Sequence, residues 1–172
     1  MIAVRDADDA ASLDQVRALL GAFAAEFGAL TAEVFAVQGF AAEAAGLPGR
    51  YAPPAGCLLL AADEAGAPLG CVALRDLGGG TCEMKRLFVD PAGRGRGVGR
   101  LLVDAVIRRA EGLGYRRMVL DTLPAMAGAV ALYREFGFAD TPPYWGHPAP
   151  GAIFLARPLE PGPPDPPTTG AP

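Results

Sequence analysis

Residues 90–102 read DPAGRGRGVGRLL, with four glycines and three arginines between positions 93 and 100. A flexible linker would not continue directly into an apolar helix, yet Leu101 and Leu102 begin a run of apolar residues at helical spacing. Glycine at every second position removes side chains where the backbone must approach another group closely. The stretch therefore predicts a strand-to-helix turn whose backbone contacts a ligand.

Three kinds of ligand site could use a turn rich in glycine and arginine. The dinucleotide pattern GxGxxG fails, because the sixth position counted from Gly93, Gly95 or Gly97 is not glycine. An RNA-binding segment is disfavoured, because the cluster is short and the chain carries a net charge of −4. An anion site fits best, since amides and the helix dipole converge at a helix N-terminus and arginines reach further oxygens. A diphosphate is the expected ligand, and a solvated surface turn is the alternative.

Apolar periodicity divides the rest of the chain into alternating strands and helices. The order is β-α-α-β-β-β-α-β-α-β, with room for one further strand at 138–143. Hairpin-length connections between the middle strands and a crossover helix after them predict an α/β (α+β) fold, with a mixed sheet and helices on both faces. The expected strands are 2–5, 57–62, 69–75, 82–89, 117–121 and 152–156. A first long helix is expected to begin at Asp8 or Asp9, and three further helices are expected over 32–45, 98–111 and 125–136.

The chain has 172 residues, which suits one domain with a single core. Its last twelve residues, PGPPDPPTTGAP, contain six prolines and no large apolar side chain. Such a segment cannot build a core. We therefore expect a single domain over residues 1–160 and a disordered, proline-rich tail over 161–172.

Composition narrows the compartment and the partners. The start, MIAVRDADDA, lacks the apolar segment of a secretory signal, and no run approaches the ~18 apolar residues of a membrane span. The cysteines, Cys57, Cys71 and Cys82, form no CxxC pair, and the chain has one histidine. We expect a cytoplasmic protein with reduced thiols, no metal, no membrane association and no nucleic-acid partner.

Residues 94–99, RGRGVG, match the (Arg/Gln)-x-x-Gly-x-(Gly/Ala) signature of the GNAT family of N-acetyltransferases. CEMKRLFV precedes this signature, and LDTLPAMAGAVALYREFGF follows it at the separation seen in that family. The chain resembles the family over roughly residues 1–159. The resemblance implies the GNAT fold, acetyl-CoA as co-substrate and transfer of an acetyl group to an amine.

The resemblance also implies how acetyl-CoA is held. The backbone amides of residues 96–100 would bind its pyrophosphate. The strand before the turn would offer main-chain partners to the pantetheine arm and a donor to the thioester oxygen. The implied cofactor-binding residues are Leu87, Phe88, Val89, Arg94, Gly95, Arg96, Gly97, Val98, Gly99 and Arg100.

Tyr133, in ALYREFGF, is similar in position to a tyrosine that many family members keep near the CoA sulfur. A phenol with a pKa of ~10 is protonated at neutral pH and can donate a proton to the departing thiolate. The resemblance therefore implies that Tyr133 is the general acid. A half-buried aromatic on the inner face of its helix is the alternative.

Glu83 lies eleven residues before Arg94, where one branch of the family carries a glutamate that acts as base. The resemblance implies that Glu83 takes the amine proton, directly or through water. An outward, solvated strand residue is the alternative. Strict alternation would put Glu83, Lys85, Leu87 and Val89 on one face of the sheet, unless a bulge changes the parity.

Other residues are candidates for the acceptor side. Asp121 ends the strand after the cofactor helix, and a helix-capping role is its alternative. Tyr144 and Trp145 could line an acceptor pocket or simply pack beneath their loop, and His147 in the same loop is a weaker candidate base. Met126 stands near the place where many relatives carry an asparagine that touches the CoA arm.

We therefore expect direct transfer from acetyl-CoA to a primary amine in a ternary complex. The acceptor, a small molecule or a peptide, is not specified by the sequence, and a homodimer is left open. The alternative is a catalytically silent module that binds acyl-CoA as a sensor or regulator. Such a module would keep the phosphate-binding turn and lose the proton-transfer residues.

Overall fold

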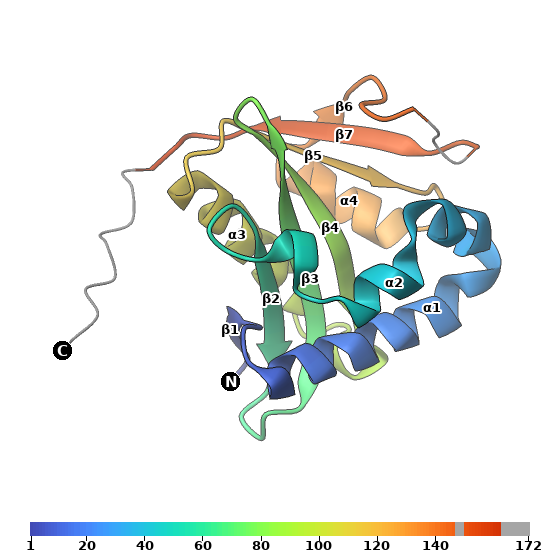
Figure 1. Ribbon diagram of the computed structural model, residues 1–172, viewed down its shortest axis with the longest axis vertical. Helices are drawn as coiled ribbons and strands as arrows, with labels where there is room; N and C mark the ends of the chain where they lie inside the picture. Colours follow the sequence, from blue (N-terminus) through green and yellow to red (C-terminus); the bar gives the residue numbers. More distant parts are fainter. Residues whose placement is uncertain (147–149, 163–172) are drawn as a thin grey trace.

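The computed structural model describes residues 1–146 and 150–162, and the side chains of residues 29–38 are not part of this description. One seven-stranded sheet has the strand order β1-β2-β3-β4-β5-β7-β6 (Figure 1). The predicted element order and the optional extra strand are both confirmed. The elements are β1 (Ala3–Asp6), α1 (Ala10–Gln38), α2 (Phe40–Ala45), η1 (Gly49–Tyr51), β2 (Cys57–Ala62), β3 (Pro68–Gly78), β4 (Thr81–Val89), η2 (Pro91–Gly93), α3 (Val98–Gly112), β5 (Arg117–Thr122), α4 (Ala127–Glu135), β6 (Ala139–Asp140) and β7 (Ile153–Pro158).

Helix α1 is longer than the sequence suggested. Asp9 begins it, because its carboxylate accepts a 2.7 Å hydrogen bond from the Ser12 amide. The helix then continues for 29 residues, whereas a separate second helix was predicted over 32–45. The break falls at Gly39, whose φ of 64° is left-handed and ends the helix without the cost of a Cβ. The predicted boundary before Ala32 is therefore wrong.

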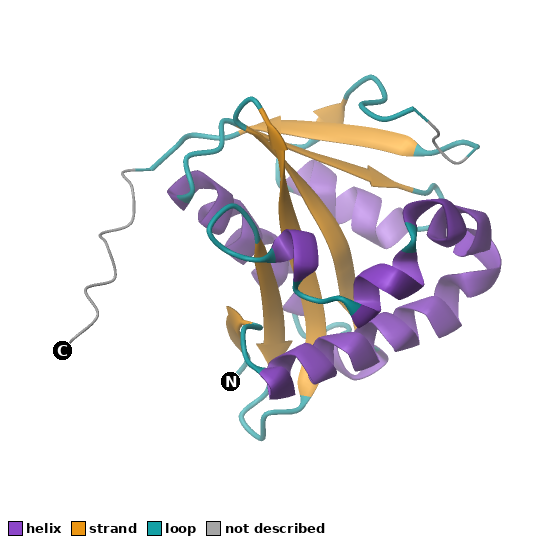
Figure 2. Ribbon diagram, in the orientation of Figure 1, coloured by secondary structure: helices purple, strands orange, loops and turns teal. Residues whose placement is uncertain are grey.

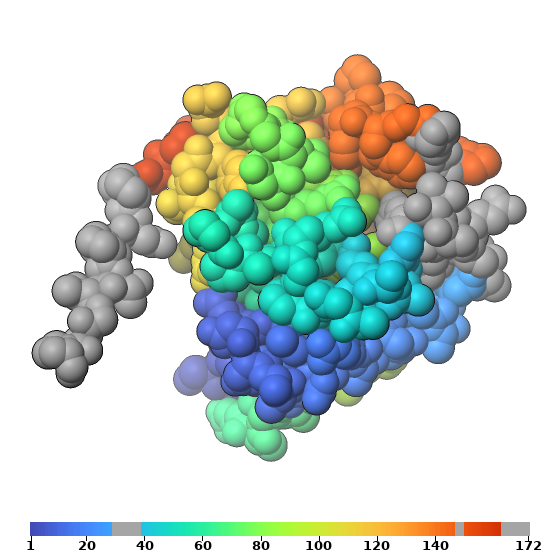
Figure 3. All heavy atoms as spheres, viewed as in Figure 1, coloured from blue at the N-terminus to red at the C-terminus, as the bar shows by residue number. Residues whose placement is uncertain are grey.

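Helices cover both faces of the sheet, as predicted (Figure 2). One core cluster packs β-sheet side chains such as Leu59 and Met84 against Leu102 and its neighbours on α3. The other packs Leu60 and Phe88 against α1, α2 and η1. In the space-filling view, α1 and the segment from α2 to η1 cover the lower and middle part of the near face (Figure 3). Among the described residues, no helix combines the length and apolarity that crossing a bilayer requires.

Strands β4 and β5 diverge after a short parallel contact. β5 pairs with β4 over Thr81–Glu83, opposite Arg117–Val119, and its other edge pairs with β7 over six residues. Beyond Glu83, β4 continues toward the glycine-rich turn while β5 leaves it (Figure 1). The β5-facing edge of residues 84–89 is therefore open to another hydrogen-bonding group.

A β-bulge interrupts β4. Lys85 lies opposite Ala73 and Phe88 opposite Cys71, so three steps on β4 match two steps on β3. The extra residue shifts the parity of the strand. Glu83 and Lys85 share the face of Ala73, toward α1 and α2. After the bulge, Leu87 and Val89 lie against the α3 side, and Phe88 lies on the α1 side. Of the two arrangements left open by the sequence, strict alternation or a bulge, the structure shows the bulge.

Candidate active site

The glycine-rich turn, residues 90–97, leads directly into the first residue of α3. Asp90 closes its first part by accepting a hydrogen bond from the Ala92 amide at 2.9 Å. Gly95 and Gly97 have φ values of 72° and 78°, which an L side chain would strain. Gly97 precedes the first residue of α3, and no side chain caps that helix. The first amides of α3 are thus available to an anion, and the helix dipole favours one there.

Gly99 has a different environment from the one expected. It lies inside the first turn of α3, and a Cβ there would lie 3.3 Å from Leu132 Cδ2 on α4. Gly99 therefore allows α3 to approach α4 closely. Gly93 has a similar role, because a Cβ there would lie 2.8 Å from the Leu69 carbonyl oxygen. Only Gly95 and Gly97 are glycines because of the turn's own conformation.

A cavity of about 630 Å³ opens beside this turn. Its walls come from the turn, the open end of β4, α1 on one side and α4 on the other. Every predicted cofactor-binding residue except Arg96 lines it. Met126 lines it as well, at the start of α4. The lining residues include Phe23, Glu26, Leu87, Phe88, Val89, Arg94, Arg100, Met126, Leu132 and Glu135.

Two of the turn's arginines are paired with carboxylates at the cavity wall. Arg94 donates to Glu26 Oε2 on α1 at 2.6 Å, and Arg100 pairs with Glu135 on α4. The hydrogen bond to Glu26 raises the pKa of Arg94. Both pairs are about half exposed, so each contributes little to stability and can exchange partners readily. Arg96 lies outside the cavity wall and donates to the Ala92 carbonyl oxygen at 3.3 Å.

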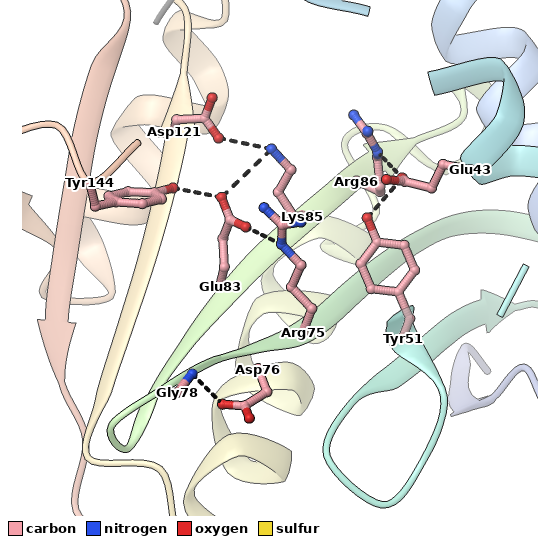
Figure 4. A network of polar contacts seen from close by, with 10 residues as sticks. All are labelled: Glu43, Tyr51, Arg75, Asp76, Gly78, Glu83, Lys85, Arg86, Asp121 and Tyr144. Carbon is pink, nitrogen blue, oxygen red and sulfur yellow. Dashed lines mark hydrogen bonds and ion pairs between the residues drawn. The ribbon is translucent and has the colours of Figure 1, made fainter. Parts of the chain in front are cut away.

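Glu83 is the centre of a buried polar network on the other side of β4 (Figure 4). Its side chain has no exposed surface. Oε1 accepts a 2.8 Å hydrogen bond from the Tyr144 hydroxyl, and Oε2 pairs with Arg75 from β3. Lys85 lies 3.7 Å from Glu83 and 3.0 Å from Asp121 on β5. The network joins three residues predicted separately for the site, Glu83, Asp121 and Tyr144.

The segment before β7 closes over this network. The Tyr144 ring packs edge-on against Phe154 at 5.3 Å, and the half-buried Trp145 packs against the same ring at 6.3 Å. Burial and the neighbouring Glu83 carboxylate raise the pKa of Tyr144, which keeps its hydroxyl protonated. Tyr144 therefore contacts a site residue directly, whereas the contacts of Trp145 are packing contacts. His147 lies outside the described residues.

Tyr133 lies in the core between α4 and the sheet. Its side chain is 7% exposed, and its ring packs against Phe138 at 6.0 Å. Burial raises the pKa of Tyr133, and Asp121 raises it further. Its helix neighbour Leu132 lines the cavity, whereas Tyr133 itself is not among the lining residues. The structure thus buries Tyr133 beside a residue that lines the cavity and keeps its phenol protonated.

The three cysteines are core residues, as expected from their apolar surroundings. Cys57, Cys71 and Cys82 are all buried and free, and burial raises the pKa of each thiol to about 12. Protonated, enclosed thiols are poor nucleophiles. Among residues 1–146 and 150–162, no group of three or more His, Cys, Asp or Glu side chains is arranged to hold a metal ion.

Sequence reasoning missed most of the partners of the site residues. Glu26 and Arg94 are 68 residues apart, and no local pattern relates them. Arg75 could have been found, because Arg75 and Glu83 are opposite each other in the β3–β4 hairpin. Placing that hairpin's turn at 79–80 would have paired the two side chains on one face.

Comparison with known proteins agrees with this description. The profile of the acetyltransferase (GNAT) family matches residues 22–138. An uncharacterized N-acetyltransferase of Schizosaccharomyces pombe is 50% identical over 107 residues, which are 62% of this chain and 66% of that relative. A GNAT-family acetyltransferase of Staphylococcus aureus shares the fold, with a TM-score of 0.74, 17% identity and coverage of 93% of this chain and 100% of that one.

A third similar protein has a solved structure with a ligand. It is a GNAT acetyltransferase of Elizabethkingia anophelis with acetyl-CoA bound, with a TM-score of 0.52, 25% identity and coverage of 61% of this chain and 77% of that one. The family match and these likenesses together support an acyltransferase. More closely, the chain belongs to the acetyltransferase (GNAT) family.

Proposed function

We propose that the protein transfers the acetyl group of acetyl-CoA to a primary amine by direct attack in a ternary complex. The observation that carries this proposal is the continuity of one cavity from the anion-binding turn to the open edge of β4. An elongated ligand with a diphosphate at one end and an amide-bearing arm at the other fits both ends. We also propose that residues 1–160 form the catalytic domain.

The turn and β4 would hold acetyl-CoA at different points. The amides of residues 96–100 would bind the pyrophosphate, with the guanidinium groups of Arg94, Arg96 and Arg100 on its outer oxygens. The main chain of Leu87, Phe88 and Val89 would pair with the pantetheine arm as an added strand partner. A backbone donor in this segment would stabilise the oxyanion that develops on the thioester carbonyl, a contribution of ~3 kcal/mol.

The transfer step needs one base and one acid. The neutral amine nitrogen attacks the thioester carbon, the C–N bond forms and the C–S bond breaks. The amine proton would pass to Glu83, and Tyr133 would protonate the departing thiolate. Because Glu83 is enclosed beneath Tyr144, we propose that the proton passes through the Tyr144 hydroxyl or through a water molecule. Asp121 and Trp145 would border the acceptor amine.

A sensor that binds acetyl-CoA without turnover is the second candidate. One observation favours it: both oxygens of Glu83 are already engaged, by Tyr144 and by Arg75. A carboxylate enclosed in this way is a less accessible base than a free one. Enzyme and sensor share the cavity and the turn, so binding alone does not separate them.

Thiol release separates the two candidates. Purified protein would be incubated with acetyl-CoA and, in turn, a lysine peptide, a peptide with a free α-amine, a polyamine, an aminoglycoside and free amino acids, and free CoA thiol measured. Amine-dependent thiol release above the rate without amine is expected for at least one acceptor. Tight acetyl-CoA binding, with no amine stimulating release, would favour the sensor. An acetylated intact protein formed before amine is added would contradict direct transfer.

A further inference from the structure

Arg86 has an unusual backbone conformation for its residue type. It is the one described non-glycine residue with a positive φ, at 59°. A left-handed conformation costs an L-residue about 1–2 kcal/mol. Arg86 also lies in the β4 bulge, where Arg86 and Leu87 together are opposite the single β3 residue Val72. Strain of this kind persists where surrounding contacts hold it, and it is concentrated at functional sites.

Three side chains from α2 and η1 hold Arg86 in place (Figure 4 shows two of them). Arg86 Nε donates to Glu43 Oε1 at 2.6 Å, and the Tyr51 hydroxyl donates to the same oxygen at 2.8 Å. The guanidinium lies over the Phe40 ring, 4.8 Å from its centre. The ion pair is almost fully enclosed, with 5% of the Arg86 side chain and 10% of the Glu43 side chain exposed.

The Glu43–Arg86 pair is ionised despite its burial. Burial by itself would raise the pKa of Glu43, but the hydrogen bond and charge of Arg86 outweigh it, and the net shift is downward. A buried ion pair contributes little net stability compared with apolar residues of similar size, because desolvation offsets the attraction. Net stability is therefore a weak explanation for the presence of a buried ion pair at a strained residue. A better explanation is that the pair fixes the backbone geometry of the bulge.

The bulge determines which side of the sheet each part of β4 serves. Before it, Glu83 and Lys85 face the polar network with Tyr144 and Asp121. After it, Leu87 and Val89 line the cofactor cavity, on a stretch that β5 does not cover. In a regular strand, Glu83 and Lys85 would lie on the same face as Leu87 and Val89. The conformation of Arg86 therefore sets the position of the backbone that meets the cavity.

We propose that Arg86 and Glu43 are positioning residues, which hold the β4 bulge so that the main chain of residues 87–89 presents its donors to the thioester. This inference rests on the proposed acetyl transfer. It assigns α2, on the opposite face of the sheet from α3, a part in the reaction although it does not line the cofactor cavity. Glu43 and Arg86 act through the backbone of β4 and contact no reacting atom.

The test uses Arg86→Gly, because glycine accepts the left-handed backbone and removes only the side-chain contacts. We expect the variant to fold and to keep most of its CoA affinity, since the turn is unchanged and only the main-chain contacts of residues 87–89 to the pantetheine arm would weaken. We expect kcat to fall by about 10²-fold, the cost of a misplacement of about 1 Å at the reacting centre. Arg86→Lys should recover part of kcat, because it restores the charge opposite Glu43 without the planar fork.

Two further variants separate positioning from general stability. Glu43→Gln should lower kcat in the same way, and combining it with Arg86→Gly should cost little more than either change alone. Asp6→Asn is the matched control, because Asp6 forms a bidentate ion pair with Arg109, at 2.7 and 2.9 Å, between β1 and α3. Asp6→Asn should leave kcat unchanged, and it should lower the Tm by no more than Arg86→Gly or Glu43→Gln does.

Hydrogen exchange at residues 84–89 adds a readout independent of turnover. Faster exchange there in Arg86→Gly, with unchanged exchange at the turn, is expected. A folded Arg86→Gly protein with wild-type kcat and wild-type exchange would overturn the inference. So would parallel losses of kcat, CoA affinity and folded protein. If the wild type binds CoA but acetylates no amine, the proposed function fails and the catalytic part of this inference fails with it.

Discussion

Tyr133 has two possible roles, general acid or core aromatic, and only the first depends on its hydroxyl group. Its raised pKa means that the phenol stays protonated through the neutral and mildly alkaline range, so it can donate but cannot act as a base there. We predict that Tyr133→Phe lowers kcat by about 10²-fold, typical of losing a general acid. The KM for acetyl-CoA should change little, because the proposed contacts to its pyrophosphate and pantetheine arm come from the turn and β4. Steady-state thiol release at several pH values measures both.

Tyr115→Phe is the matched control for this prediction. Its hydroxyl donates to the Ala55 carbonyl oxygen at 2.6 Å, and its ring is buried to a similar degree as that of Tyr133. Removing that hydroxyl should cost stability by about 1 kcal/mol and leave turnover unchanged. Unchanged turnover in Tyr133→Phe as well would remove Tyr133 from the mechanism and leave it a core residue.

The strand position of Glu83 could be predicted from the sequence, but its burial and its partners could not. Its place on the central strand followed from the motif, and both its burial and its partners depended on other parts of the chain. Tyr144 is 61 residues from it in sequence, and the bulge at Arg86 separates it from Leu87 and Val89. A residue's type and motif can suggest a role, but its accessibility is a property of the folded surroundings.

At the scale of elements, the start of α3 is the most constrained feature. We predict that Gly97→Ala destabilises the protein by about 1–2 kcal/mol, because a Cβ at a φ of 78° is strained. A shift of the turn backbone should also weaken acetyl-CoA binding by about tenfold, equivalent to about 1.4 kcal/mol. Thermal unfolding and calorimetric titration with acetyl-CoA measure the two effects.

Gly21→Ala is the control within another helix. Gly21 lies in α1, and an added Cβ there meets no atom within 4 Å. Alanine has the higher helix propensity, by about 1 kcal/mol, so this variant should be stabilised and should bind acetyl-CoA normally. Equal behaviour of the two variants would show that the conformation of Gly97 is not what the turn requires.

The elements themselves were predictable where a local signal marks their ends. Proline at 91 and the glycines that follow mark the end of β4 and the start of α3, and both were placed correctly. The break between α1 and α2 was misplaced, because Gly28 and Gly39 look alike in sequence and only Gly39 adopts the left-handed conformation. A glycine permits a break, and packing selects which one is used.

At the scale of the whole molecule, the burial of thiols and phenols should make the free energy of unfolding fall at alkaline pH. The pKa of each cysteine thiol is raised from 9.0 to about 12, and that of Tyr115 from 10.0 to about 12. A raised pKa means that the folded state keeps protons that the unfolded chain releases. The stabilisation is complete below the unfolded pKa and is lost as the pH rises toward the folded value.

We therefore predict that the free energy of unfolding is constant near neutral pH and falls above about pH 9. At about pH 10.5 the loss should be roughly 2 kcal/mol for each thiol. Urea unfolding at several pH values measures it, and a variant with all three cysteines changed to alanine should show a shallower decline. A free energy of unfolding that stays constant up to pH ~10.5 would contradict the burial of these groups.

The sequence by itself determined the order of elements, the turn between β4 and α3 and the family, because these depend on neighbouring residues: apolar periodicity, glycine spacing and a short signature. Only the tertiary structure decided the β4 bulge, the divergence of β4 from β5 and the partners of Glu83 and Arg86. These depend on the register of β3 and on side chains of α2, β5 and the segment before β7. Such partners are far apart along the chain, and the free energy that pairs them arises only when the sheet has formed and excluded water around them.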